Sequence, residues 1–313
     1  MHYSVMLNEV IESLNLKSDG IIVDATLGYG GHSSRILERI KSGHLFAFDQ
    51  DIEAIEFSQK RLECLGTNFT IIKSNFLYMK EELLKRDIQK VSGIVFDLGV
   101  SSPQLDNKER GFSYLHDARL DMRMDKDGSI SAYDVVNTYS ESDLYRIIRD
   151  YGEEKYAKNI ARNIVHAREK KNIETTFELV DIVKHSMPYK ETIEKNPARR
   201  TFQAIRIEVN HELDILDASI RNALSMLEVN GRIAVITFHS LEDRIVKKIF
   251  KEVTNVDKVA RSLPVVPDAY LPKFKTIIDT APTNEELLEN NRSRSARLHV
   301  IERIREDNNE KES

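Results

Sequence analysis

Acidic side chains stand at the ends of three short apolar runs in the first third of the sequence. Asp24 lies near the end of the first run, Ile21–Thr26, and Asp49 and Asp97 directly follow two later runs. Apolar runs of this length are typical of strands that are buried on both faces. Parallel strands bring their carboxyl ends to one edge of a sheet, where ligands bind, so we expect the three carboxylates to share one crevice.

A glycine-rich loop follows the first apolar run and leads into a helical pattern. It contains Gly28, Gly30 and Gly31. Small residues let the backbone approach a ligand, and the start of a helix adds amide donors. A dinucleotide fingerprint needs a third glycine where Ser33 stands, so the loop favours S-adenosylmethionine, whose sulfonium and amino groups are positive, over NAD. A plain tight turn is the alternative interpretation of the glycines.

Two further side chains fit an adenosyl ligand. Asp49 can accept hydrogen bonds from both ribose hydroxyls, and Phe76, which follows a third apolar run at Phe69–Ile72, can lie against the adenine. Each has a structural alternative, since Asp49 could cap the next helix and Phe76 could fill the core. Acids at several strand ends beside one glycine loop nevertheless predict an adenosyl cofactor.

These residues require a framework of alternating strands and helices. Such a pattern occupies both ends of the chain, with further strands expected at Arg232–Phe238 and near Leu298–Ile301. A long helix is expected to stop at Asn230-Gly231. The pattern predicts an α/β fold with a parallel, Rossmann-like sheet.

The middle of the chain, from 103 to about 212, has no strand pattern and reads as helices. Ser140 can cap one helix, and Thr175 with Glu178 forms a capping box at the start of another. The predicted insertion leaves from the end of the fourth strand, so we expect it to cap the ligand-binding edge.

Composition excludes several classes of protein. The 313 residues are 41% hydrophobic and 31% charged, values of an ordinary globular protein. No apolar run is long enough to span a membrane, no signal peptide is evident, and one cysteine allows no internal disulfide. These features predict a cytoplasmic protein without a membrane partner, and a net charge of -5 argues against coating nucleic acid over the whole surface.

A series of motifs resembles a known family, the bacterial S-adenosylmethionine-dependent methyltransferases that modify N4 of a cytidine in 16S ribosomal RNA. The resemblance runs nearly end to end and implies a class I methyltransferase sheet with a mostly helical inserted domain. The motifs that carry it are His2–Leu7, Gly30–Ser33, Asp97–Asp106, Arg110–Ser113, Leu120–Asp125, Tyr151–Glu154, Arg200–Ala204 and Phe238–Arg244.

The resemblance also implies a domain division and a set of cofactor contacts. Residues 1–102 and 213–305 would form the methyltransferase domain and 103–212 the helical insertion for substrate recognition. The polar composition of residues 306–313 predicts a disordered tail. The expected cofactor-binding residues are Gly30, Gly31, His32, Asp49, Phe76, Asp97 and Gln104.

The expected reaction is methyl transfer to an amine, which requires no metal. The usual motif of amino-methyltransferases, an acid, asparagine or serine followed by two prolines and an aromatic residue, is replaced here by Asp97-Leu98-Gly99-Val100. The group that holds the target amine is therefore open. Asp97 is the first choice as catalytic residue, because a carboxylate can hold and align the amine.

The expected partner is 16S ribosomal RNA, within the small ribosomal subunit. Phe112 can stack on a base beside Arg110, and guanidinium groups match phosphates. The other arginines assigned to the substrate are Arg123, Arg199, Arg200, Arg292 and Arg294. Solvated faces are the plainer interpretation of the basic clusters, and Arg200 could instead be a strut that pairs with Asp121 or Asp125.

Other functions remain open from the sequence. A methyltransferase with a protein, DNA or small-molecule acceptor would share the cofactor site, and an inactive ribosome-assembly factor would share the RNA-binding surface. The sequence is also compatible with a homodimer.

Overall fold

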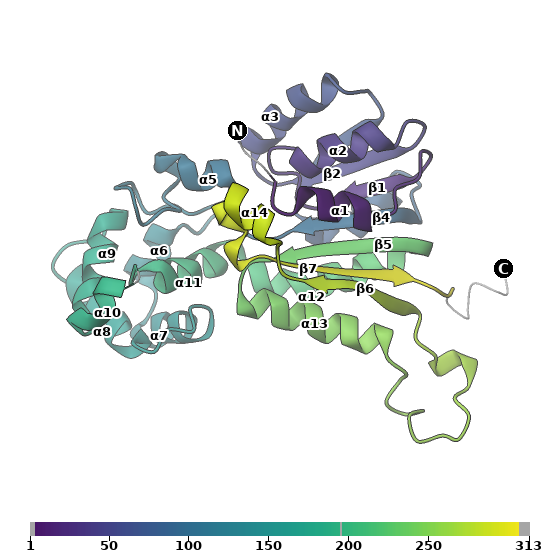
Figure 1. Ribbon diagram of the computed structural model, residues 1–313. Coiled ribbons are helices and arrows are strands. Elements are labelled where there is room, and N and C mark those ends of the chain that lie inside the picture. The colour runs from purple at the N-terminus through teal and green to yellow at the C-terminus, as the bar shows by residue number, and fades with distance from the viewer. Residues whose placement is uncertain (1–3, 195, 307–313) are drawn as a thin grey trace. The chain divides into compact units, whose positions relative to one another are not determined.

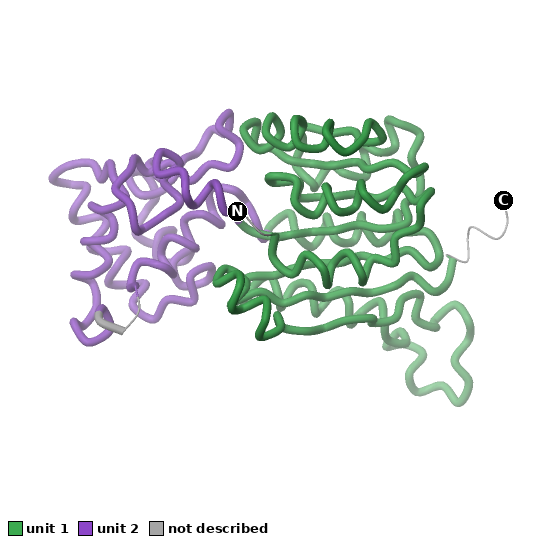
Figure 2. Tube along the Cα trace, turned by 45° about the horizontal axis from the view of Figure 1, so that its top comes forward, with its two compact units in different colours: residues 1–99, 214–313 green, residues 100–213 purple. Residues whose placement is uncertain are grey.

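The computed structural model describes residues 4–194 and 196–306. The expected disordered tail, 306–313, lies outside the described residues except for its first position. The chain divides into two compact units (Figure 2): unit 1 consists of residues 1–99 and 214–313, and unit 2 of residues 100–213.

Unit 1 contains a seven-stranded sheet of order β3-β2-β1-β4-β5-β7-β6 (Figure 1). The first five strands pair in parallel, and β7 is antiparallel to β5 and β6. The α/β class is confirmed, although the sheet is mixed and not wholly parallel. The strands are β1 Ile21–Asp24, β2 His44–Asp49, β3 Phe69–Lys73, β4 Val91–Asp97, β5 Leu227–Thr237, β6 Phe274–Thr280 and β7 Arg297–Arg303.

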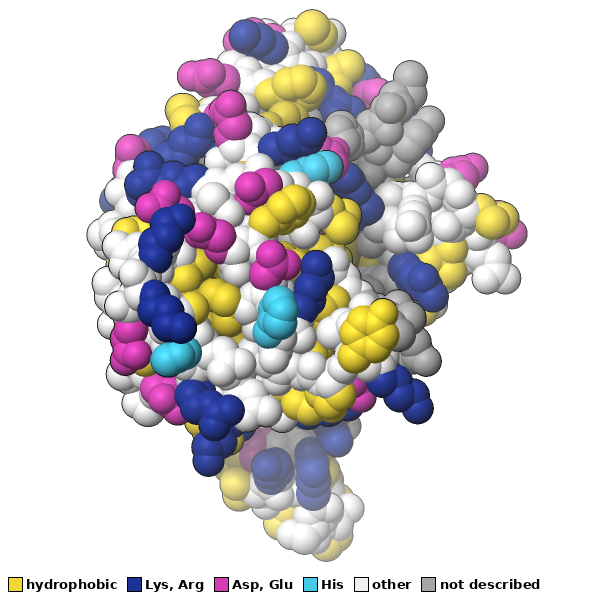
Figure 3. All heavy atoms as spheres, turned by 90° about the vertical axis from the view of Figure 1, so that its left-hand side faces the viewer, with side chains coloured by type: hydrophobic (Ala, Val, Ile, Leu, Met, Phe, Trp, Pro, Cys, Tyr) yellow, Lys and Arg dark blue, Asp and Glu magenta, His cyan; other side chains and the backbone are white. Residues whose placement is uncertain are grey.

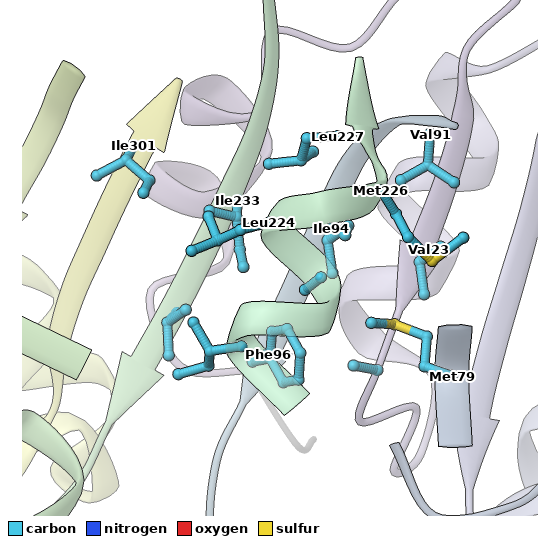
Figure 4. Packing of buried hydrophobic residues seen from close by; sticks show 14 of the residues in the cluster. Val23, Met79, Val91, Ile94, Phe96, Leu224, Met226, Leu227, Ile233 and Ile301 are labelled. Carbon is cyan, nitrogen blue, oxygen red and sulfur yellow. The ribbon is translucent and has the colours of Figure 1, made fainter. Parts of the chain in front are cut away.

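Helices cover both faces of this sheet. Successive strand residues point to opposite faces, so an apolar strand offers side chains to both layers of helices. In β1, Ile22 packs with one group of helices and Val23 with the other. The first group is α1 Leu7–Ser13, α2 Gly31–Arg39 and α3 Ile52–Glu63; the second is α4 Met79–Leu84, α12 Glu212–Met226 and α13 Ser240–Thr254. Figure 4 shows the second core, where Phe96 and Ile94 pack against Leu224.

The helix stop expected at Asn230-Gly231 is wrong in position. α12 already ends at Met226, and Asn230-Gly231 lies inside β5. Asn230 has a φ of 69°, and the register between β4 and β5 shifts between Val91 and Gly93. The turn-forming pair therefore makes a strand irregularity.

The remaining elements of unit 1 are short. They are η1 Phe76–Tyr78, η3 Asp268–Tyr270, α14 Asn284–Glu289 and η4 Asn291–Ser295. No helix in the described ranges is both long and apolar enough to cross a membrane.

Unit 2 is helical around its own apolar core. Its elements are α5 Ser102–Asp106, η2 Lys108–Arg110, α6 Ala132–Thr138, α7 Glu141–Asp150, α8 Ala157–Arg168, α9 Thr176–His185, α10 Tyr189–Glu194 and α11 Arg199–Asn210. Ser140 caps α7, and the capping box of Thr175 and Glu178 starts α9, so both predicted helix starts are confirmed.

Candidate active site

The glycine loop after β1 is held to β2 and α3 by side chains. The Gly28 amide donates to Oδ2 of Asp49 at 2.8 Å, and the Ser58 hydroxyl of α3 donates to the Gly28 carbonyl at 2.8 Å. Gly28 and Gly30 have φ values of 49° and 73°, a region that favours glycine. The loop is therefore a fixed turn whose shape depends on Asp49.

Asp49 also organises the chain that follows it. Its Oδ1 accepts a hydrogen bond from the Asp51 amide at 2.8 Å, while Asp51 itself caps α3. Burial raises the pKa of Asp49 to about 6. A carboxylate offers about four lone-pair positions, so these two backbone bonds leave acceptor capacity for a ligand at the carboxyl end of β2.

Asp24 is buried beneath the loop. Its carboxylate accepts hydrogen bonds from the Ser33 hydroxyl at 2.7 Å and from the Thr26 amide at 3.1 Å. Burial raises its pKa to about 6, although these hydrogen bonds act in the opposite direction. Asp24 thus ties the end of β1 to the first turn of α2.

Asp97 ends β4 at the same carboxyl edge. Its backbone amide donates to the Thr26 hydroxyl at 2.6 Å, and its side chain is 26% exposed. Oδ1 is buried and, among the described residues, has no hydrogen-bond partner. Burial, with the negative charges of Asp24 and Glu242, raises the pKa of Asp97 to about 8. An unpartnered buried acceptor of this kind fits a donor or a cation supplied by a ligand.

His32, in the first turn of α2, lies between Asp97 and the N-terminal segment. Its Nε2 is 3.2 Å from the Val5 carbonyl oxygen and its Nδ1 is 3.7 Å from Oδ2 of Asp97. Burial lowers the pKa of His32 to about 4, so the ring is neutral at pH 7. Because a carbonyl can only accept, the proton lies on Nε2, and Nδ1 turns a lone pair toward Asp97.

The other two residues expected at the cofactor site in unit 1 have clear packing roles. Gly31 lies under Ser4, and a Cβ at this position would collide with the Ser4 side chain. Phe76 is half-buried and packs edge-on against Phe96 of β4, with ring centroids 5.6 Å apart. One edge of Phe76 is therefore fixed by the core, and its exposed part is available to a flat ligand.

Sequence reasoning missed the side chains that brace this edge. Thr26, Ser33 and Ser58 hold Asp97, Asp24 and Gly28 respectively. Glu242 is buried at the start of α13, where it accepts from the Phe238 amide at 2.7 Å. Only Glu242 had a local signal, because it stands at the third position of a capping box that begins at His239.

The predicted substrate residues of unit 2 have mixed environments. Arg110 is buried and donates to the carbonyl oxygens of Arg123 and Met124, and Phe112 is buried in the unit 2 core. Both side chains therefore have packing roles within unit 2, and their contact with RNA stays a prediction. Gln104 is also buried, and its Oε1 accepts from the Ser101 amide in a capping box.

The remaining arginines divide into paired and exposed ones. Arg123 donates to both oxygens of Asp121 and to the Gly128 carbonyl, so its guanidinium is engaged within its own loop. Arg200 donates to the Glu153 carbonyl at 3.0 Å, not to Asp121 or Asp125. The exposed side chains are Arg199 and Arg200 at the start of α11 and Arg292 and Arg294 on η4.

Together these features define a class of protein. The parallel sheet extended by antiparallel β7, with a glycine loop and acids at its carboxyl edge, is that of a class I methyltransferase. A model of the MraW methylase family matches residues 1–304. The chain belongs to this family.

Two curated relatives are similar over almost their whole length. Ribosomal RNA small subunit methyltransferase H of Exiguobacterium sibiricum is 50% identical over 308 residues, which cover 97% of this chain and 99% of that protein. The protein of the same name from Streptococcus mutans is 52% identical over 310 residues, covering 97% and 98%.

Proposed function

We propose that this protein transfers a methyl group from S-adenosylmethionine to the exocyclic N4 of a cytidine in 16S ribosomal RNA of the small ribosomal subunit. The observation that carries the proposal is the end-to-end similarity to two ribosomal RNA small subunit methyltransferases at 50% and 52% identity. The choice of N4 of cytidine rests on the motif series that resembles the N4-cytidine methyltransferases. A ribosomal substrate supports a cytoplasmic location.

The carboxyl edge of unit 1 fits S-adenosylmethionine. Asp24, Asp49 and Asp97 all have pKa values raised by burial, and Asp97 keeps one buried oxygen without a partner among the described residues. Burial disfavours the ionised form of these acids, and a positively charged ligand beside them favours it. The site therefore suits a ligand that carries positive charge. When bound, this cofactor supplies an electrophilic methyl group on a sulfonium.

Each residue of the edge then has a task. The loop at Gly28 to Gly31 lets the backbone approach the ligand, and the start of α2 offers amides to its carboxylate. Asp49 accepts from the ribose hydroxyls, and the exposed part of Phe76 lies against the adenine. His32 holds the N-terminal segment and faces Asp97.

Asp97 is the proposed catalytic residue. The lone pair of the cytosine amine is delocalised into the ring, so an acceptor must hold and align the amine for in-line attack. Oδ1 of Asp97 is such an acceptor. Transfer of the methyl group would form the C–N bond, break the C–S bond and release the thioether, and the amine would lose a proton. The ionised form of Asp97, whose pKa is raised to about 8, can take this proton.

Unit 2 is proposed to recognise the RNA. A buried target base must first leave its stack, which costs a few kcal/mol, so contacts elsewhere have to anchor the strand. Figure 3 shows one face of the molecule, on which lysine and arginine side chains are interspersed with acidic ones. Such a mixed surface suits local docking on a structured particle and agrees with the net charge of -5.

The exposed arginines are expected to contribute to RNA affinity through phosphates. In two paired variants, Arg199→Ala with Arg200→Ala and Arg292→Ala with Arg294→Ala, the slope of log affinity against log salt should become shallower by about 0.7–0.9 for each lost phosphate contact. Binding of 16S RNA at several salt concentrations measures the slope. Arg39→Ala with Arg86→Ala removes the same charge from exposed positions of unit 1 and serves as control.

Melting temperatures decide the alternative role of Arg200. Its bond to the Glu153 carbonyl makes it part of the packing of α11. If the α11 pair lowers the melting temperature and leaves the salt slope unchanged, Arg200 is a strut and the phosphate assignment fails for that pair.

The function itself is tested by nucleoside analysis. Mass spectrometry of 16S RNA from cells with and without this protein should show an N4-methylated cytidine that depends on the protein. Identical nucleoside profiles would exclude the proposal. Transfer of labelled methyl from S-adenosylmethionine to purified small subunits then separates the enzyme from an inactive assembly factor.

A further inference from the structure

Helix α13 presents a row of cations that the proposed site does not use. Arg244, Lys248 and Lys251 are exposed and stand at i, i+4 and i+7, so they lie on one face of the helix. We call these three residues the α13 stripe. The opposite face is fixed by the core, since Val246 and Ile249 are fully buried.

Two members of the stripe, Lys248 and Lys251, have neighbours whose charges are already paired. Lys247, beside the stripe, pairs with Asp243 at 2.9 Å. Neither Lys248 nor Lys251 has an ion-pair partner within the described part of the chain. Glu252, the next acid along the helix, is held by Arg221 of α12 at 2.7 Å. The nearby acids Asp243 and Glu252 are therefore already paired with other cations.

The stripe borders a shallow hollow in the surface and begins close to the catalytic edge. Ser240, Asp243 and Lys247 line this hollow with the stripe itself. α13 starts directly after β5, whose Ile236 is in register with Asp97. From Arg244 to Lys251 the stripe spans about 10 Å at 1.5 Å per residue. A strand whose base reaches Asp97 could thus continue along α13.

We propose that the α13 stripe binds phosphate groups of the RNA strand that carries the target cytidine. The inference rests on the proposed function and adds a surface of unit 1 to the recognition assigned to unit 2. Lysines on one helix face act as point charges, which suits a backbone that is read without regard to sequence. Each phosphate contact displaces a condensed counterion, so binding through the stripe is salt-dependent.

The test compares two double variants with the same change in charge. Lys248→Ala with Lys251→Ala should weaken binding of a 16S RNA transcript about 2- to 30-fold, as for two exposed ion pairs, and make the salt slope shallower by about 1.4–1.8. Lys41→Ala with Lys60→Ala, at exposed positions next to α2 and on α3, should bind like wild type. Unchanged affinity and slope for the α13 variant would overturn the inference.

Two further measurements keep the outcomes distinct. If the α13 variant loses affinity for small ribosomal subunits but binds naked 16S RNA normally, the stripe contacts a ribosomal protein and the phosphate assignment is wrong. If wild-type protein neither binds nor methylates RNA or subunits, the proposed function has failed instead. Unchanged melting temperature and S-adenosylmethionine affinity in the α13 variant exclude misfolding as the cause of a loss.

Discussion

Replacing Asp97 with asparagine is expected to lower methyl transfer by about 100-fold or more while binding of RNA changes little. Asparagine keeps the size of the side chain and one acceptor oxygen, but it cannot take a proton. The Oδ1 atom of Asp97 is buried without a partner among the described residues, so its acceptor capacity is free for the target amine. Single-turnover methylation and RNA titration, run side by side, measure the two effects.

The same variant should alter stability with a definite dependence on pH. The pKa of Asp97 is raised to about 8 in the folded protein, whereas an unfolded chain has an aspartate pKa of about 3.9. The folded state therefore binds the proton more tightly, and the free energy of unfolding falls as pH rises from about 4 to 8. Asp97→Asn removes this loss, so its melting temperature should exceed that of wild type at pH 8 and match it near pH 4.

Asp19→Asn is a suitable control, because Asp19 is exposed. Equal losses of methyl transfer and RNA binding in Asp97→Asn would assign Asp97 a structural role.

Wild-type affinity for S-adenosylmethionine should also rise with pH up to about 8, since a cation prefers the ionised carboxylates of the site.

Asp49→Ala is expected to weaken S-adenosylmethionine binding by about 100-fold or more, because two hydrogen bonds to a charged acceptor are each worth roughly 1.5–3 kcal/mol. Asp49→Asn keeps one carbonyl acceptor and should show a smaller loss. Calorimetric titration of both variants gives the affinities. An unchanged affinity in Asp49→Ala would remove Asp49 from the cofactor site.

The variant Ser58→Ala tests whether Asp49 binds the ribose directly or acts only by supporting the glycine loop. Both Asp49 and Ser58 hold Gly28, one at its amide and the other at its carbonyl, each at 2.8 Å. Ser58→Ala loosens the loop and leaves the carboxylate in place. If it weakens binding as much as Asp49→Ala does, Asp49 acts through the loop and not on the ribose.

The sequence predicts the inner strands well because their physical cause is local. β1, β2 and β4 are apolar runs buried on both faces, and each ends at an acid. β6 escaped notice because it is an edge strand: Phe274–Thr280 is buried only at Phe274 and reads as a mixed segment. Its membership in the sheet comes from pairing with β7, a contact that local pattern does not encode.

The site residues also divide into those that the sequence predicts and those that it does not. Topology alone predicts that the strand-end acids converge, because the ends of parallel strands share one edge. The environments of Arg110 and Arg123 could not be predicted in this way. Both carry the charge expected of a phosphate ligand, but packing within unit 2 supplies partners for them first, namely backbone carbonyls and Asp121. A sequence shows where charge is, and the fold determines whether it is already satisfied.

The order of the strands has a consequence for how the protein emerges during synthesis. β5 pairs with β4, although the residues of unit 2 lie between these two strands in the sequence. β7, among the last residues described, lies in the sheet between β5 and β6. The helical unit is contiguous in sequence and has its own core, so it can fold while the chain is still being made. The sheet cannot close until β7 has left the ribosome. The helical unit can therefore fold before the sheet of unit 1 is complete.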